Sequence, residues 1–83
     1  MSNVKELIID NRCGGIVKQV RLQLNCTQAE LGKKIGVNNI TMCRIERRHE
    51  LPTESMLIKL AAVAGCSTYQ LTGQEPINYA AIY

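Results

Sequence analysis

The sequence predicts an all-α protein, built as a compact bundle of five short helices. Apolar residues recur at helical spacing in successive stretches of the chain, and polar residues that can cap a helix stand before most of these stretches. Glycine or asparagine follows several of them, as at many helix ends. The body of the chain has no convincing strand pattern. Because none of these helices is long enough to be stable alone, they must pack on one another.

The first helix is predicted from Ile16 to Leu24, where the apolar residues Val17, Val20 and Leu24 share one face. Residues 1–12 form an N-terminal extension, in which VKELII is a short helix or a strand. Cys13-Gly14-Gly15 is expected to break the chain between the extension and the helix. Asn25 tolerates the left-handed conformation and is expected to end the helix.

Two very short helices follow, joined by a glycine. Thr27 is a natural N-cap for a helix over residues 28–35, and Glu30 completes a capping box with it. This helix ends at Gly36, and Asn38 caps the next one. The residues of the two helices that are predicted to face the core are Leu31, Ile35, Met42 and Ile45.

Two further helices complete the bundle. Pro52 marks a boundary, and the fourth helix begins at Thr53 or Ser55 and ends at Gly65. Ser67 caps a last helix over residues 68–71, which Gly73 closes. Residues 74–83 end in INYAAIY, an apolar and aromatic segment without a helical stripe, and form a C-terminal tail.

The positive charge is concentrated in the middle of the chain. The formal net charge is +3, and all ten lysines and arginines lie at or before Lys59. Five basic residues and one glutamate lie between Lys33 and Arg48. Such a patch suits attraction to phosphate, although a solvated helical surface has the same composition.

Several classes of protein are disfavoured. The four cysteines lack metal-binding spacing and are too widely spread to suggest a disulfide framework, so we expect no metal and no cofactor. No apolar run approaches the roughly 18 residues of a membrane span, and the N-terminus lacks the layout of a signal peptide. We expect a cytoplasmic, nucleoid-associated protein without membrane contact. His49 has no plausible nucleophile beside it, so an enzyme is not expected.

The middle of the chain resembles a known family. The pattern TQxELxxxIGVxxxTMxRIE is followed by a polar turn, a proline and LxxLAxxAGCS. This pattern resembles the helix-turn-helix domain of phage repressor and Cro proteins, the XRE-like family. The resemblance covers about Gly14 to Gly73. It implies a bundle of the lambda-repressor-like type, with residues 13–73 as the DNA-binding domain.

The resemblance also implies roles for single residues. Gln28 matches a glutamine that bridges a phosphate and the recognition helix, and Gly36 matches the glycine of the tight turn. Arg21 and Glu46 match a pair that forms an internal salt bridge, so neither is expected to contact a base. The chain departs from the family at Arg48, where the recognition helix commonly ends with glycine. Either this turn is built differently, or Arg48 accepts backbone strain to present a charge.

The second helix of a helix-turn-helix lies in the major groove. Asparagine can pair with adenine, arginine with guanine, and an aliphatic side chain can pack on a thymine methyl group. The predicted base-reading residues are Asn39, Ile40 and Arg44, with Thr41 and Cys43 facing DNA nearby. The predicted phosphate contacts are Gln28, Lys33, Asn38, Arg47, Arg48 and His49. The alternatives are a surface ion pair for Arg44, a solvated role for Lys33 and a redox-sensitive thiol at Cys43.

A single domain of this size buries too little surface to be very selective, so a homodimer on a palindromic operator is expected. The predicted dimer contacts are the apolar tail residues Ile77, Tyr79, Ile82 and Tyr83. A tail folded over its own core, or a disordered tail, is the alternative. The sequence therefore predicts a transcriptional regulator that binds double-stranded DNA, with repression as the leading interpretation. The alternative is a protein-interaction module, an antitoxin or adaptor, that keeps the fold without specific DNA reading.

Overall fold

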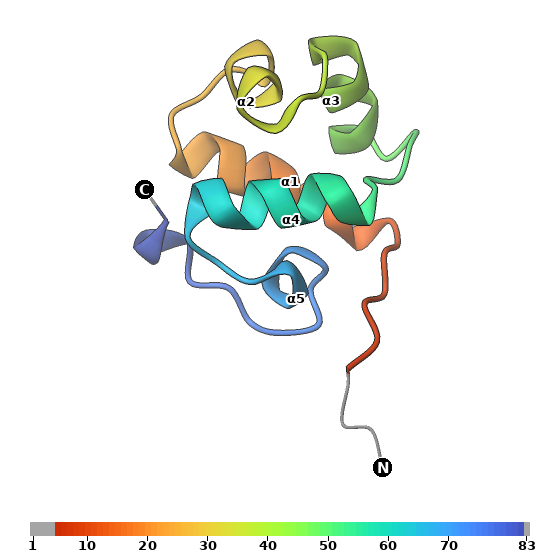
Figure 1. Cartoon of the computed structure of the whole chain (residues 1–83), viewed down its shortest axis with the longest axis vertical. Helices are drawn as coiled ribbons and strands as arrows, with labels where there is room; N and C mark the ends of the chain where they lie inside the picture. Colours follow the sequence, from red (N-terminus) through yellow and green to blue (C-terminus); the bar gives the residue numbers. More distant parts are fainter. Residues whose placement is uncertain (1–4, 83) are drawn as a thin grey trace.

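The computed structural model describes residues 5–82, and over this range the chain forms five α-helices, one short 3-10 helix and no strand. The elements are α1 (Arg12–Gln23), α2 (Gln28–Ile35), α3 (Asn39–Glu46), α4 (Glu54–Ala64), α5 (Thr68–Leu71) and η1 (Tyr79–Ala81). α1 and α4 form a central layer, with α2 and α3 on one side of it and α5 with the tail on the other (Figure 1). The predicted all-α bundle is confirmed. None of the helices described is long and apolar enough to cross a membrane.

The first helix begins at Arg12 rather than at Ile16. The expected break at Cys13-Gly14-Gly15 is wrong, because these residues lie inside α1 and Cys13 is fully buried. Asp10 supports this helix start: the Arg12 amide donates to Asp10 Oδ1 at 2.9 Å, and the Cys13 amide donates to the Asp10 carbonyl at 3.1 Å. Two glycines cost a helix roughly 1 kcal/mol each. A close contact with α3, described below, requires one of them.

The other helix ends follow local chemistry, as predicted. Thr27 and Glu30 form the capping box of α2, with bonds of 3.1 Å and 2.8 Å between side chain and backbone. These bonds hold the pKa of the Glu30 carboxyl below its ordinary value. Asn38 Oδ1 accepts from the Thr41 amide at 2.8 Å and so caps α3. Of the two proposed starts for α4, the structure has Thr53 as the N-cap.

The core is aliphatic and lies between the helices. The predicted core residues of α2 and α3, Leu31, Ile35, Met42 and Ile45, are all buried. Leu57 and Leu60 of α4 close the core from the other side. Cys26 and Cys66 are half-buried and pack against this cluster. Burial raises the pKa of the Cys66 thiol, as suits a cysteine that acts as a small apolar residue.

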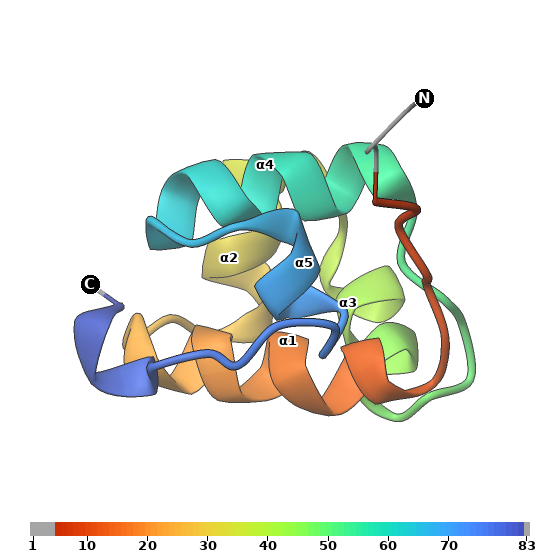
Figure 2. The ribbon, with the colours of Figure 1, turned by 90° about the horizontal axis from the view of Figure 1, so that it is seen from below.

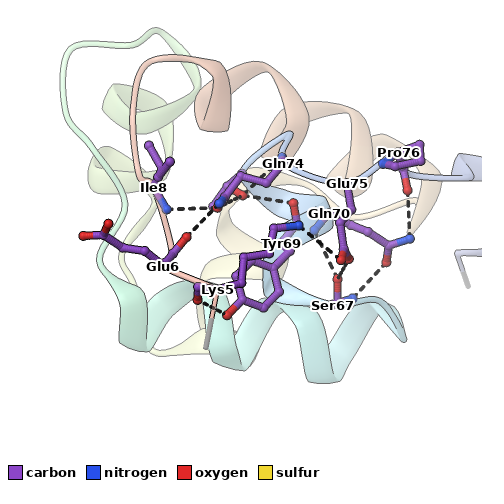
Figure 3. A network of polar contacts seen from close by, with 10 residues as sticks. Lys5, Glu6, Ile8, Ser67, Tyr69, Gln70, Gln74, Glu75 and Pro76 are labelled. Carbon is purple, nitrogen blue, oxygen red and sulfur yellow. Dashed lines mark hydrogen bonds and ion pairs between the residues drawn. The ribbon is translucent and has the colours of Figure 1, made fainter. Parts of the chain in front are cut away.

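Residues 5–9 form an extended arm that runs beside α5 (Figure 3). The side-chain amide of Gln74 binds the backbone of this arm twice: it donates to the Glu6 carbonyl at 2.7 Å and accepts from the Ile8 amide at 2.9 Å. The buried Thr72 hydroxyl lies 2.7 Å from the same Gln74 oxygen and helps to hold the amide in place. Gln74 therefore binds the arm through main-chain atoms, as a neighbouring strand would.

Further contacts fix the beginning of the arm. Tyr69 Oη donates to the Lys5 carbonyl at 2.6 Å, and Lys5 Nζ lies 3.3 Å from Glu75 Oε2. Leu7 and Ile9 pack against the core. The sequence pattern left a helix or a strand open for this segment. Its described part is extended but pairs with side chains instead of a sheet.

The tail returns along α1, and η1 lies beside that helix (Figure 2). Gln23 Nε2 donates to the Tyr79 carbonyl at 2.9 Å, and Ile77 and Tyr79 pack partly on the core. Ile82 is only 7% exposed. This residue completes the protein's own core, as in the alternative of a tail folded over its core, and it offers little surface for the predicted dimer contact. Tyr83 lies outside the described residues.

Gln74→Ala should release the arm from α5. The substitution removes both bonds to the arm backbone, so we expect the free energy of unfolding to fall by roughly 1–2 kcal/mol. Hydrogen exchange at the Ile8 amide should accelerate strongly. Gln19→Ala, at an exposed glutamine of α1, is the matched control. Equal protection of the Ile8 amide in both variants would show that Gln74 does not hold the arm.

Candidate nucleic-acid interface

A glycine sets how closely α2 approaches the turn before α3. A Cβ at Gly32 would collide with the carbonyl oxygen of Val37. The turn reverses at Gly36, whose φ of 74° favours a residue without a side chain. Val37 then turns inward and packs against the core. In this chain the turn lies too close to α2 for a methyl group at Gly32.

A second glycine brings α1 equally close to α3. A Cβ at Gly14 would collide with the carbonyl oxygen of Ile45, near the C-terminal end of α3. Gly14 is fully enclosed by this contact. The sequence analysis missed its role, although Cys13, Val17 and Val20 already share helical spacing and indicate an earlier helix start. The two short helices of the motif therefore rest on backbone-to-backbone contacts.

An ion pair fixes the C-terminal end of α3. Arg21 binds Glu46 through two nitrogens, at 2.6 Å and 2.9 Å, and the two side chains are only 12% and 3% exposed. Arg21 Nη1 also donates to the Cys26 carbonyl at 3.0 Å, and Gln28 Nε2 donates to Glu46 Oε1 at 3.1 Å. The hydrogen bonds to Glu46 raise the pKa of Arg21 above its ordinary value. Neither member of the pair is free to contact a base.

The predicted base-reading residues all lie on α3. Asn39, Ile40 and Arg44 are exposed, and Ile40 is 68% exposed although it is a large apolar residue. Thr41 and Cys43 are half-buried beside them. The opposite side of α3 carries the buried Met42 and Ile45. The core therefore fixes the helix while an asparagine, an isoleucine and an arginine face solvent.

Arg44 contacts an acidic neighbour in this structure. Its Nε lies 3.3 Å from Glu50 Oε1, and both side chains are about half exposed. The surface ion pair that the sequence analysis named as an alternative is therefore formed. Exposed pairs of this kind contribute at most about 1 kcal/mol. A guanine edge can therefore compete with Glu50 for the Arg44 guanidinium.

The predicted phosphate contacts lie at both ends of the motif. Lys33, Arg47 and His49 are exposed. Gln28 is half-buried and bonded to Glu46, as a glutamine that orients the recognition helix should be. Asn38 uses its side-chain oxygen for the cap of α3, and its exposed amide group can still donate hydrogen bonds through the nitrogen.

Arg48 has a left-handed backbone, with a φ of 64°. Its amide donates to the Ile45 carbonyl at 3.0 Å, and the following His49 amide donates to the Arg44 carbonyl at 2.8 Å. These two bonds form a Schellman motif, in which glycine usually takes the position of Arg48. Of the two alternatives raised by the sequence, the strained arginine is the one found.

The described residues hold no pocket and no cluster of histidine, cysteine or acidic side chains that could bind a metal ion. The exposed face of α3 and the cations around it are therefore the candidate functional surface within residues 5–82.

Comparison with known proteins agrees with this geometry. The helix-turn-helix family model matches residues 17–71. The fold is similar to the crystal structure of the P22 c2 repressor protein in complex with synthetic operator 9T in the presence of Tl+. The TM-score is 0.69 and the sequence identity 30%, over 76% of this chain and 96% of that chain. No curated protein matches the sequence significantly.

The contact between Gly14 and α3 can be tested with a matched pair of variants. Gly14→Ala should lower the free energy of unfolding by roughly 1–3 kcal/mol, because its methyl group meets a backbone carbonyl that cannot move aside alone. Gly15→Ala meets only the mobile end of Arg48 and should be neutral or stabilising by about 1 kcal/mol. Chemical denaturation measures both. Equal effects would contradict a special role for Gly14.

Proposed function

Because the chain belongs to the helix-turn-helix family of phage-repressor (XRE) type, we propose that it is a transcriptional regulator that recognises a specific sequence in double-stranded DNA. It binds a palindromic operator as a homodimer and acts as a repressor. This function places the protein on chromosomal or phage DNA in the cytoplasm. The P22 c2 repressor structure supports a DNA partner, since that protein is bound to a synthetic operator.

The construction of α3 is the observation that carries the proposal. Its inner side is buried by Met42 and Ile45, and its C-terminal end is tied to α1 by Glu46. Its outer side presents Asn39, Ile40 and Arg44 to solvent. An isoleucine that is 68% exposed on a rigid helix is unfavourable in water, and contact with an apolar surface would remove that exposure.

Each exposed side chain of α3 has a matching group in the major groove. Asn39 forms two hydrogen bonds with the N6 and N7 edge of an adenine, and Arg44 with the O6 and N7 edge of a guanine. Ile40 packs on a thymine methyl group. Thr41 and Cys43 line the same side and contact neighbouring bases. A good bidentate contact contributes roughly 1–3 kcal/mol of discrimination against the wrong base.

Phosphate contacts orient the domain on the duplex. Lys33, Arg47 and His49 approach the backbone directly, while Gln28 and Asn38 donate from their amide groups. Glu46, the one acid within residues 33–48, is neutralised by Arg21, so this face keeps its positive character. The resulting affinity falls with added salt, because each neutralised phosphate releases counterions.

The homodimer uses the surface of α4, α5 and the tail, since residues 60–83 carry Glu75 as their one charged residue. Ile58 of α4 is 53% exposed. Ile77 and Tyr79 keep part of their surface free and remain predicted contacts, as does Tyr83. Two copies joined here carry two recognition helices, which fit half-sites about 34 Å apart.

Selection from a pool of random duplexes tests the proposal. We expect the wild-type chain to enrich a palindrome with half-sites about one helical turn apart. Arg44→Ala should relax the preference at one guanine of each half-site and leave the others unchanged. Arg12→Ala is a matched control, because Arg12 is similarly exposed and similarly paired, with Asp10, but lies outside the motif. It should enrich the wild-type palindrome.

Two results would contradict the proposal. If the wild-type chain enriches no sequence and loses all binding at modest salt, specific DNA reading is excluded. The protein-interaction module would then be the better description. If a sequence is enriched without palindromic symmetry, the reader is a monomer and the homodimer is excluded.

A further inference from the structure

We propose that Arg48 is a positioned phosphate contact, and that the chain keeps a strained backbone there to supply it. Its side chain lies over Gly14 and Gly15 of α1, here called the glycine seat, which leave room for it. The inference rests on the proposed function and adds to it a device that couples α1 to DNA affinity. Three features of the structure support it: the backbone of Arg48, the position of its side chain and the absence of a carboxylate partner among the residues that the structure describes.

The backbone of Arg48 is one that favours glycine. At a φ of 64° it occupies the Schellman position after α3, where most side chains are disfavoured. Asn25 takes the corresponding position after α1, and asparagine tolerates it far better. An arginine at such a position weakens the fold, so we look for a use of its side chain that outweighs this cost.

The side chain of Arg48 lies against the glycine seat. A Cβ at Gly14 would be 3.2 Å from Arg48 Cγ, and a Cβ at Gly15 would be 3.0 Å from Arg48 Nη2. The aliphatic part therefore crosses Gly14 and the guanidinium reaches Gly15. Side chains at these positions would displace the arginine. The seat thus places a cation at a defined point beside the C-terminal end of α3.

The guanidinium of Arg48 has no carboxylate partner among residues 5–82. Arg12, Arg21 and Arg44 each form an ion pair there, with Asp10, Glu46 and Glu50. A guanidinium without an internal anion is suited to an external one, and the flat fork of arginine matches phosphate oxygens. Arg47 and His49 on either side are exposed and would share the same stretch of DNA backbone.

A purely structural reason for Arg48 exists as well. Its positive charge is favourable at the C-terminal end of α3, where the aligned peptide dipoles of the helix leave a partial negative charge. Under that reading, Arg48→Met should weaken the fold and leave DNA affinity unchanged. Under the proposal, Arg48→Met should lower DNA affinity, and Arg48→Gly should strengthen the fold while it lowers affinity.

The experiment measures stability and DNA affinity together. Thermal unfolding and binding across a salt series are compared for wild type, Arg48→Gly, Arg48→Met and Arg48→Lys, on the selected operator and on an unrelated duplex. Arg48→Gly should raise the melting temperature by roughly 2–5 °C. Arg48→Gly and Arg48→Met should lower affinity about fivefold near physiological salt on both duplexes, and reduce the salt slope by about 0.9 per bound chain. Arg48→Lys keeps the positive charge and should therefore keep most of the salt dependence of DNA affinity.

The glycine seat is tested through its dependence on Arg48. Gly15→Leu fills the seat and should lower operator affinity by about twofold or more in the chain that carries Arg48. It should have no effect in the Arg48→Met chain. Gly15→Ala gives a milder displacement if the leucine disturbs α1. Lys5→Met is the charge control, because Lys5 contacts Tyr69 of α5 (Figure 3), and α5 lies on the other side of α1 and α4 from α2 and α3 (Figure 1). It should leave the slope unchanged.

Each outcome decides a separate point. If Arg48→Met leaves the salt dependence of DNA affinity unchanged, Arg48 does not contact a phosphate. If Arg48→Gly lowers the melting temperature, the backbone of Arg48 is not strained. If Gly15→Leu lowers operator affinity equally in the wild-type and Arg48→Met chains, the glycine seat does not act through Arg48. A wild-type chain that binds neither duplex overturns the proposed function itself, and the inference with it.

Discussion

The recognition helix α3 has eight residues, and a helix of this length is not stable alone in water. Its order therefore has to come from contacts with the rest of the bundle. Arg21 and Glu46 supply one of these contacts, a bidentate ion pair shielded from solvent that ties the C-terminal end of α3 to α1. At the other end, Asn38 caps the first turn. Between these two points Met42 and Ile45 anchor the helix in the core, and only its outer side is left for a ligand.

Much of this design is local and could be predicted from the sequence. The caps at Thr27, Asn38 and Ser67 and the turn at Gly36 depend on a few neighbouring residues, and the structure has them where the pattern places them. The start of α1 could not be predicted in the same way. Gly14 lies inside a helix that packs against α3. The residue there has to be glycine, because the carbonyl oxygen of Ile45, far away in the sequence, occupies the space that a side chain would fill. Local propensity opposed the helix, and a tertiary contact decided for it.

The candidate site shows the same division. The identity of the exposed residues on α3 follows from helical spacing, and the Arg21–Glu46 pair follows from the family resemblance. The conformation of Arg48 could not be predicted, since a left-handed arginine and a differently built turn are both compatible with the sequence. The burial of Ile82 was left open, as one of the alternatives for the tail, because it depends on the path of the tail along α1. Sequence patterns identify residue types on a helix, whereas the path of irregular segments depends on the assembled fold.

The attachment of the arm has a consequence for how this protein can evolve. Gln74 binds the backbone of Glu6 and Ile8, while the side chains of these two residues are exposed. Mutations at these two positions therefore leave the attachment intact, while Gln74 and Thr72 are constrained by it. The exposed edge of the arm can diversify among descendants of this chain and acquire new surface properties without disturbing α5 or the exposed side of α3. Because Gln74 binds only main-chain atoms of the arm, the exposed side chains of the arm can change in sequence while the arm stays attached.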